Sequence, residues 1–395
     1  MRTVDAAGLP IGDGHPPRIM GVLNVSEESP YKPSVFDDAG EAAAYVDEVL
    51  IGEGADIVDV GLESANKRFE VLSAEEELKR LDTAIETIES TSGDAIFSIE
   101  TRYHEVAAEA LDRGFDMVND ICGFADPEMP RVCRDRGVAV CKMASPPDLE
   151  RPGAIEDVEE IYDALTRNGL TDKTIVDPAF GGWSEAKTLG DDRETFHRLR
   201  EFRALDRPIL VSINRKNFLR SVAGRDTEEA LPVSLAATSM AVERGAHVIR
   251  THDVAETRDA ALIGAEFSRD RFRSPGGDGR VGVEELDVTT VEEANRHLEQ
   301  VTSNGSEERG DSERTGVLSG SESGAVSRAY LLTDLSADAL AEIRGTATET
   351  DPLVAGSAEA VLVAGSVSAI DGFVEALPDG SPARQALRDA IEATA

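Results

Sequence analysis

Short apolar runs alternate with amphipathic segments from residue 18 to about residue 270 of the 395-residue chain. Segments such as 39–55 and 73–89 carry apolar residues at helical spacing. Eight strands, each followed by a helix, predict an α/β fold of the (β/α)8 TIM-barrel class. A doubly wound open sheet is the alternative, but it rarely needs eight strands in strict alternation. The apolar runs are mostly rich in Val and Ile, as buried parallel strands are, and they span 18–25, 56–61, 95–100, 116–121, 138–143, 174–177, 208–213 and 247–251.

The composition of the chain changes after Arg273. Residues 274–280, SPGGDGR, have the composition of a linker, and a strand and a helix are expected within 280–301. Residues 303–324 are rich in Ser, Gly and acidic residues, which predicts a flexible segment. We therefore expect three parts, namely a barrel over residues 1–272, a partly disordered linker region over 273–325, and a small α/β appendage without a catalytic motif over 326–395.

The chain is strongly acidic, with 77 Asp and Glu against 40 Lys and Arg and a formal net charge of −37. Such a surface repels phosphates and anionic headgroups, which argues against nucleic-acid and membrane partners. Seven of the 40 basic residues are Lys and the others are Arg. Acidic excess with scarce Lys is typical of a halophilic, salt-accumulating cell, because dense carboxylates keep the surface hydrated while salt screens their repulsion. An acidic protein from a GC-rich mesophile is the alternative.

The sequence also indicates a location inside the cell. The N-terminus has no apolar segment of the kind found in signal peptides, and no run reaches the roughly 18 apolar residues of a membrane span. Cys122, Cys133 and Cys141 are too few for a disulfide framework and match no zinc-binding spacing. Since they lie in or beside apolar segments, we expect buried free thiols in a cytoplasmic protein.

Polar residues gather at the carboxyl ends of the eight expected strands, where a barrel of this class places its active site. Any one of them could be a structural group with satisfied hydrogen bonds, but their convergence on one face indicates a site. They are Asn24, Glu63, Ser64, Glu100, Thr101, Asn119, Asp120, Lys142, Asp177, Asn214, Arg215, Lys216, Arg250, His252 and Asp253.

The basic members of this set indicate a phosphate. Arg215, Lys216, Arg250 and His252 follow the last two strands, where barrels frequently bind phosphate. Arg offers a bidentate fork for phosphate oxygens, and Lys offers a point charge.

The acidic and amide members indicate a different part of the ligand. Glu100, Asn119 and Asp177 form an acceptor-rich cluster that suits a planar heterocycle with several N–H donors, such as a pterin or the edge of guanine. Together, the two groups of residues predict a phosphorylated, donor-rich heterocycle as the ligand.

Seven motifs, in this order, resemble those of the dihydropteroate synthases. IMGVLNVSEES at 19–29 is similar to the family's I-M-G-I-L-N-V-T-P-D-S-F, and GADIVDVGLES at 54–64 to its G-A-D-I-I-D-I-G-G-E-S-T. The resemblance covers about residues 18–268. The wider group of pterin-binding barrels includes the methyltetrahydrofolate–corrinoid methyltransferases, which share the fold and part of the pterin pocket. The other motifs are SIET at 98–101, MVNDICG at 117–123, DPAF at 177–180, NRKNF at 214–218 and RTHDVAETRDA at 250–260.

The resemblance implies a transferase of folate synthesis. It would join 6-hydroxymethyl-7,8-dihydropterin diphosphate to 4-aminobenzoate and release diphosphate and 7,8-dihydropteroate. Early loss of diphosphate would leave a pterin-stabilised cation that the arylamine captures. By resemblance, Asn24 would bind the diphosphate with the help of Mg²⁺, and Arg250 and His252 would complete this anion site. A homodimer is the implied assembly.

The other roles follow from the same motifs. By resemblance, Glu100, Asn119 and Asp177 would hold the pterin, and Lys216 would close on it. Lys216, Asp177 and Asn24 are thereby the expected catalytic residues. The remaining expected substrate-binding residues are Ser64 in the second motif and, near the aminobenzoate, Asn214 and Arg215.

Most departures from the family pattern fall on the acceptor side. Ala65 stands in place of the usual Thr after G-x-E-S, and Asn66-Lys67-Arg68 replaces Arg-Pro-Gly. Asn214 replaces a Ser, and Glu100 replaces the usual Asp and is one methylene longer. The acceptor therefore stays open, and so does turnover with Glu100. The alternatives are a pterin-dependent transferase with another acceptor, a methyltetrahydrofolate methyltransferase-like enzyme, a pterin-binding protein without turnover, and a phosphate-binding barrel outside this group.

The charge imbalance predicts a dependence on salt. Without screening, the carboxylates repel one another across the folded surface. We expect activity and cooperative unfolding to be lost below a few tenths molar KCl, measured by activity and circular dichroism at constant pH. Full stability in dilute buffer would exclude the halophilic interpretation.

Overall fold

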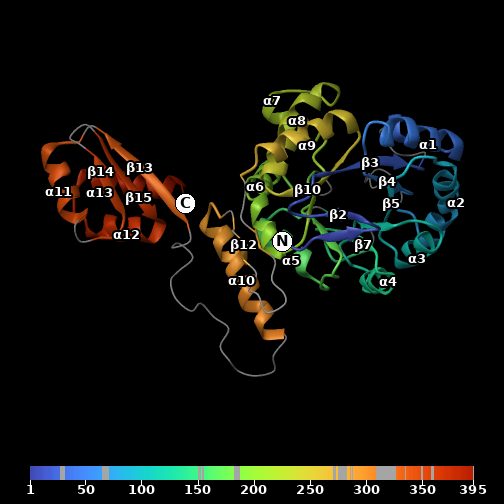
Figure 1. The fold of residues 1–395 in the computed structure, drawn as a ribbon, viewed down its shortest axis with the longest axis horizontal. Helices are drawn as coiled ribbons and strands as arrows, with labels where there is room; N and C mark the ends of the chain where they lie inside the picture. The colour runs from blue at the N-terminus through green and yellow to red at the C-terminus, as the bar shows by residue number, and fades with distance from the viewer. Residues whose placement is uncertain are drawn as a thin grey trace. The chain divides into compact units, whose positions relative to one another are not determined.

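Eight parallel strands form a closed barrel in the computed structural model of the chain (Figure 1). The barrel order is β10-β3-β4-β5-β6-β7-β8-β9, so each strand pairs with its neighbour in sequence and the last closes on the first. Each predicted apolar run forms one strand, which confirms the TIM-barrel prediction. The strands are β3 (Arg18–Asn24), β4 (Ile57–Gly61), β5 (Ile96–Thr101), β6 (Met117–Asp120), β7 (Ala139–Met143), β8 (Thr174–Asp177), β9 (Ile209–Val211) and β10 (Ala246–Thr251). The structure describes residues 1–26, 32–64, 71–149, 153, 155–181, 187–269, 273–274, 283–284, 286, 288–307, 326–333, 335–347, 350–356 and 360–394.

Helices surround the barrel and bury its outer face (Figure 1). Side-chain hydrogen bonds cap the first turn of several of these helices. Ser73, for example, accepts from the Glu76 amide while the Glu76 side chain accepts from the Ser73 amide, which makes a capping box at the start of α2. The surrounding elements are η1 (Lys32–Ser34), α1 (Ala39–Tyr45), the π-helix η2 (Val46–Ile51), α2 (Ala74–Ser90), α3 (His104–Asp112), α4 (Met129–Arg136), α5 (Val158–Thr166), α6 (Leu189–His197), η3 (Leu199–Leu205), α7 (Asn217–Ala223), η4 (Glu228–Ala230), α8 (Leu231–Glu243) and α9 (Val254–Glu266).

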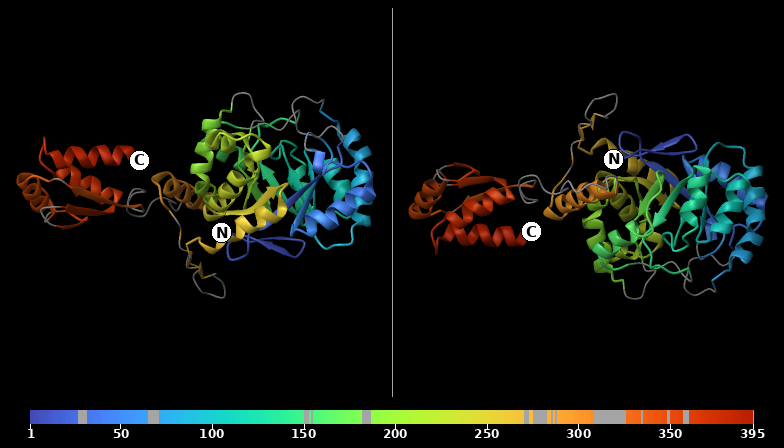
Figure 2. Two further views of the ribbon diagram at one scale, coloured as in Figure 1. Left: turned by 90° about the horizontal axis from the view of Figure 1, so that it is seen from above. Right: turned by 90° about the horizontal axis from the view of Figure 1, so that it is seen from below.

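An N-terminal hairpin that the sequence analysis did not predict lies at one end of the barrel, in dark blue in Figure 2. It consists of β1 (Val4–Ala6) and β2 (Leu9–Ile11), paired antiparallel. Its apolar side chains join those at the start of the barrel strands in one buried cluster. The opposite end, where the strands finish, is therefore the end left for polar side chains. The cluster includes Val4, Ala6, Ile11, Met20, Ile57, Met117, Ala139, Cys141, Ile175, Leu210 and Val248.

Strand register decides which polar residues become neighbours at that polar end. Pairing places Asn24 of β3 beside Gly61 of β4, Gly61 beside Glu100 of β5, and Glu100 beside Asn119 of β6. Since side chains alternate between the two faces of a strand, these positions share the inner face. Two residues earlier in each strand, and therefore on the same inner face, Asp59 of β4 pairs with Ser98 of β5.

The residues after Arg269 form a second compact unit, Asp270–Ala395. It contains a short ladder of β11 (Arg273–Ser274) and β12 (Val283–Glu284), and helix α10 (Val291–Glu307). The expected flexible segment at 303–324 therefore begins inside a helix, and 308–325 lies outside the described residues. No helix among the described residues combines the length and apolar composition needed to cross a bilayer.

A small α/β part occupies the C-terminal end of this unit. A three-stranded antiparallel sheet has the order β13-β15-β14 and packs with its helices around its own core, which includes Ile343, Val363 and Phe373. The elements are β13 (Ser327–Thr333), α11 (Ala337–Ala347), β14 (Leu353–Gly356), β15 (Ala360–Ser366), α12 (Val367–Ala376) and α13 (Pro382–Thr394).

The division at Arg269 makes a prediction about folding. Because the barrel unit has a closed sheet and its own core, a chain truncated after Arg269 should unfold cooperatively in molar KCl, within a few degrees of the full chain. Thermal unfolding of both chains, followed by circular dichroism, checks this. An insoluble truncated chain beside a stable full-length chain would show that the barrel needs the second unit.

Candidate active site

A pocket at the carboxyl ends of the strands brings together residues from β5, β6, β7, β8 and β10 and from the loops after β6, β8 and β9. Its free volume is about 30 Å³, which is room for about one water. Five of the residues predicted from the sequence line it. The lining residues are Glu100, Asn119, Ile121, Met143, Asp177, Ala179, Phe180, Ser212, Lys216 and Arg250.

Arg250 is held inside the barrel by two carboxylates. Its Nε donates to Asp59 Oδ2 at 2.7 Å, and its terminal nitrogen donates to Glu100 Oε2 at 2.5 Å. Asn119 Nδ2 also donates to Asp59 Oδ2, at 3.0 Å. Asp59 is not among the residues predicted from the sequence, although a carboxylate in the middle of an apolar run was a signal that could have identified it. Arg250, expected at the diphosphate, thus lines the same pocket as the residues expected at the pterin.

Burial sets the protonation of the acids in this pocket. It raises the pKa of Glu100 to about 7; Arg250 lowers that pKa and Asp59 raises it. It also raises the pKa of Asp177 to about 6, against a hydrogen bond from the Ala179 amide to Asp177 Oδ1 at 2.8 Å. Both carboxyl groups can therefore take up a proton near neutral pH. Each group only accepts hydrogen bonds when it is ionised and can also donate one when it is protonated.

Lys216 reaches the pocket across a glycine. A Cβ placed on Gly181 would lie 3.0 Å from Lys216 Nζ and 3.1 Å from Lys216 Cδ. Gly181 also has a φ of +110°, which L side chains rarely adopt. Burial, and next the charge of Arg250, lower the pKa of Lys216 to about 8. The ammonium is therefore mostly charged at neutral pH, but it can release a proton more easily than an exposed lysine.

Asn24 lies close to Gly61, where the lack of a side chain makes the approach possible. Asn24 Nδ2 donates to Ser34 Oγ at 3.1 Å. A Cβ placed on Gly61 would lie 3.0 Å from Asn24 Oδ1 and 3.8 Å from Glu100 Oε1. An amide oxygen is the kind of protein ligand that Mg²⁺ accepts together with water and phosphate oxygens. The residues present therefore fit the expected metal.

His252 is neutral at physiological pH. Burial, and next the charge of Arg250, lower its pKa to about 3. A neutral imidazole offers one N–H donor and one acceptor nitrogen rather than a positive charge. Its expected contribution to the anion site is thus a hydrogen bond. It is not among the residues that line the pocket.

Asn214 and Arg215 both donate hydrogen bonds to Asp253 at the edge of the site. Arg215 donates to both Asp253 oxygens, at 2.8 and 2.9 Å, and Asn214 Nδ2 donates to Asp253 Oδ2 at 2.9 Å. Arg215 also donates to the carbonyls of Thr227 and Glu228. Neither residue lines the pocket. The structure thus gives them a role in joining the loops after β9 and β10, and their contact with an aminobenzoate stays a prediction.

Asp120 and Lys142 lie near the carboxyl ends of β6 and β7, but they do not line the pocket. They pair with each other across β6 and β7, on the opposite face from Asn119. Asp120 accepts from the amides of Cys122 and Phe124, and Lys142 Nζ lies 4.7 Å from the centre of the Phe124 ring. The structure therefore gives them local contacts outside the pocket.

The second motif is described only in part. Ser64 is buried at its end, and Glu63 pairs with the buried Arg102. The altered residues Ala65, Asn66, Lys67 and Arg68 lie outside the described residues.

The cysteine prediction is confirmed, because the three thiols are free and buried.

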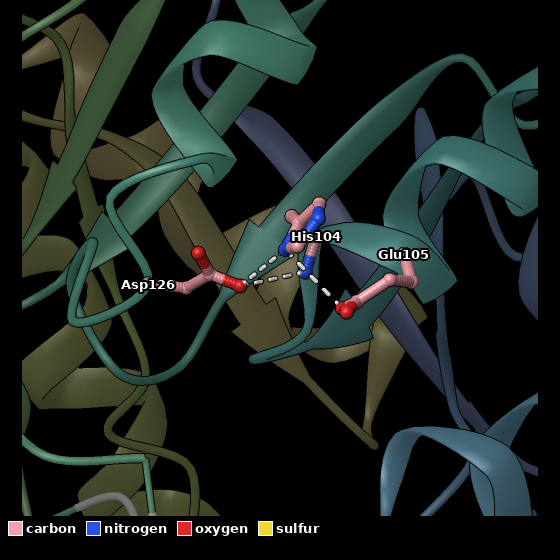
Figure 3. Close-up of side chains that lie close together, drawn as sticks. All are labelled: His104, Glu105 and Asp126. Atoms are coloured by element: carbon pink, nitrogen blue, oxygen red, sulfur yellow. Dashed lines mark hydrogen bonds and ion pairs between the residues drawn. The ribbon is translucent and has the colours of Figure 1, made fainter.

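His104, Glu105 and Asp126, which are residue types that ligate metals, lie together elsewhere in the described part of the barrel, as Figure 3 shows. His104 Nδ1 lies 2.7 Å from Asp126 Oδ2 and 3.2 Å from Glu105 Oε2. Asp126 also accepts from the amides of His104 and Glu128. These contacts join the start of α3 to the loop after β6. Mg²⁺ prefers oxygen ligands, so this group with an imidazole is no substitute for Asn24.

The fold and the pocket define a pterin-binding barrel, and the comparisons with known proteins agree. The family model described as "Pterin binding enzyme" matches residues 20–252, more than half of the chain. The chain belongs to this pterin binding enzyme family and, within it, to the dihydropteroate synthases.

Three known proteins illustrate the likeness. The Escherichia coli dihydropteroate synthase is 31% identical over 275 residues, which cover 65% of this chain and 94% of that protein. A probable bifunctional folylpolyglutamate synthase/dihydropteroate synthase of Haloferax volcanii is 35% identical over 267 residues, 65% of this chain, but the chain spans only 31% of that protein's length. The Coxiella burnetii dihydropteroate synthase in complex with pteroic acid has a TM-score of 0.56 and 29% identity, and the match covers 67% of this chain and 98% of that one.

The raised pKa of Glu100 predicts how stability varies with pH. In the folded state its pKa is about 7, above its ordinary value of 4.5. The folded protein thus binds this proton more tightly than the unfolded chain, and the stability that Glu100 supports falls as the pH rises between these values. A Glu100→Gln variant lacks this titration. Its Tm relative to the native protein should increase from about pH 5 to about pH 8 at constant KCl. A constant difference would show that Glu100 is ionised throughout.

Proposed function

We propose that the protein condenses 6-hydroxymethyl-7,8-dihydropterin diphosphate with 4-aminobenzoate to give 7,8-dihydropteroate and diphosphate. The observation that carries the proposal is the convergence of Glu100, Asn119, Asp177, Lys216 and Arg250 in one pocket at the mouth of a barrel of this family. Acceptors for N–H groups and two cations are what a pterin with a departing diphosphate requires.

The chain's own residues would contribute in three ways. Asp177 and Asn119 would accept hydrogen bonds from the pterin ring and fix its orientation. The carboxylates of Asp177 and Glu100 would stabilise positive charge on the pterin as the bond between its methylene carbon and the diphosphate breaks. Lys216 would close over the ring and exclude water until the arylamine nitrogen forms the new C–N bond. Mg²⁺ at Asn24 would supply positive charge to the departing diphosphate.

The setting of this activity is part of the proposal. The acidic, lysine-poor composition supports a protein that works in the cytoplasm of a halophilic cell at high salt. The dihydropteroate synthase family supports a homodimer.

A second candidate is a pterin-dependent transferase with another acceptor. It is favoured by one observation, the engagement of Arg215 by Asp253 and by two backbone carbonyls. An arginine whose donors are used in this way has less capacity to bind the carboxylate of an aminobenzoate.

The direct test is incubation of the purified protein in molar KCl with the pterin diphosphate, 4-aminobenzoate and Mg²⁺, followed by detection of dihydropteroate. Product would support the proposal. Binding of the pterin without product would favour another acceptor or a protein without turnover.

Two substitutions separate the two parts of the substrate. Asp177→Asn replaces an acceptor facing the pterin's N–H groups with a donor, so binding of 6-hydroxymethyl-dihydropterin should fail. Arg250→Ala should weaken free diphosphate more than the pterin and lower kcat/KM by roughly 30- to 1000-fold. Titration of both variants with both ligands checks this, and equal loss of the two ligands in both variants would contradict the division.

A further inference from the structure

Asp59 is a carboxylate buried inside the barrel at the middle of β4. Its residue is fully shielded from solvent, and its neighbours in the strand, Val58 and Val60, are equally buried. Burying an ionised carboxylate is costly unless it is paired and hydrogen-bonded. Its position therefore needs a reason beyond packing, and its contacts supply one.

One oxygen of Asp59 organises two residues of the pocket. Asp59 Oδ2 accepts from Asn119 Nδ2 at 3.0 Å and from Arg250 Nε at 2.7 Å. The side-chain amide of Asn119 has its donor group on one side and its acceptor oxygen on the other. With Nδ2 directed to Asp59, Oδ1 is the atom that Asn119 can present to a ligand.

The other oxygen of Asp59 has no hydrogen-bond partner among the described residues, although it is buried. Ser98 Oγ, on the neighbouring strand at the paired position, is in the same condition. Buried polar atoms are seldom left in this state, and such atoms beside a pocket point to a donor from a ligand or from a water beneath it.

A comparison with Asp120 shows that this arrangement is particular to Asp59. Asp120, on β6, is equally buried, but its two oxygens accept from the backbone amides of Cys122 and Phe124. Asp120 therefore serves the local backbone, whereas Asp59 serves two side chains that line the pocket.

We propose that Asp59 is a positioning residue for pterin recognition: it orients Asn119 so that its carbonyl oxygen faces the ligand, and it holds Arg250 against the pocket wall. This inference rests on the proposed function, because the ligand is taken to be a pterin with N–H donors. Asp59 acts through Asn119 and Arg250, and its influence should fall on the pterin diphosphate and not on the acceptor.

The test compares Asp59→Asn with Asp120→Asn as the matched control, both at molar KCl. Asp59→Asn is nearly isosteric but puts a donor or an uncharged oxygen against Asn119 and Arg250. We expect it to weaken binding of 6-hydroxymethyl-dihydropterin, followed by the pterin's fluorescence, by roughly 10- to 100-fold. The KM for 4-aminobenzoate should stay within about twofold, since the effect is confined to pterin recognition. Asp120→Asn should lower Tm without changing pterin affinity.

A double-mutant cycle tests whether the effect passes through Asn119. In an Asn119→Ala background, Asp59→Asn should cost less pterin affinity than it does in the native background. If Asp59→Asn does not fold, Asp59→Ser takes its place in the same comparison, because it also removes the carboxylate that Asn119 and Arg250 share.

The possible outcomes distinguish a failure of the proposed function from a failure of the positioning role of Asp59. Absence of pterin binding by the native protein would overturn the proposed function itself. If the native protein binds pterin and the Asp59 variant binds it equally well, the positioning role is wrong. Equal loss in the Asp59 and Asp120 variants, or an unchanged cost in the Asn119→Ala background, would also overturn it.

Discussion

A guanidinium buried between two carboxylates is the interaction on which the site depends. Arg250 joins Asp59 to Glu100 inside the mouth of the barrel. None of the three charges could stay there alone, because an unpaired buried charge costs several kcal/mol, whereas the set together is largely compensated. The same pairing orients Asn119 through Asp59, and the positive charge of Arg250 adds to burial, the larger cause, in lowering the pKa values of Lys216 and His252. Arg250 thus takes part both in the arrangement of the pocket and in the protonation of its neighbours.

Two features of the fold accommodate these charges. The hairpin β1–β2 covers the other end of the barrel with apolar contacts, and the surface buried there stabilises the interior. At the polar end, Gly61 and Gly181 leave space where a side chain would collide with Asn24 or Lys216. A methyl group at either glycine would press on a functional side chain, and at Gly181 it would also strain the backbone.

Much of the fold was predictable from the sequence, because strand identity depends on local composition. The eight apolar runs are short and rich in β-branched residues, and each became one strand of the barrel. The acceptors Glu100, Asn119 and Asp177 follow such runs directly, and their place at a common mouth follows from the parallel order alone. Hairpin β1–β2 escaped prediction, since its strands are only three residues long and show no clear period.

The sequence by itself thus determined the barrel, the polar end and the kinds of group gathered there. Tertiary structure decided which of those groups face one another. Asn119 and Asp120 are adjacent in the chain, yet one lines the pocket and the other binds loop amides, because successive side chains alternate between the faces of a strand. Asp59 meets Arg250 across 191 positions of sequence, and only closure of the barrel, with its particular register, brings two such distant charges within hydrogen-bond distance.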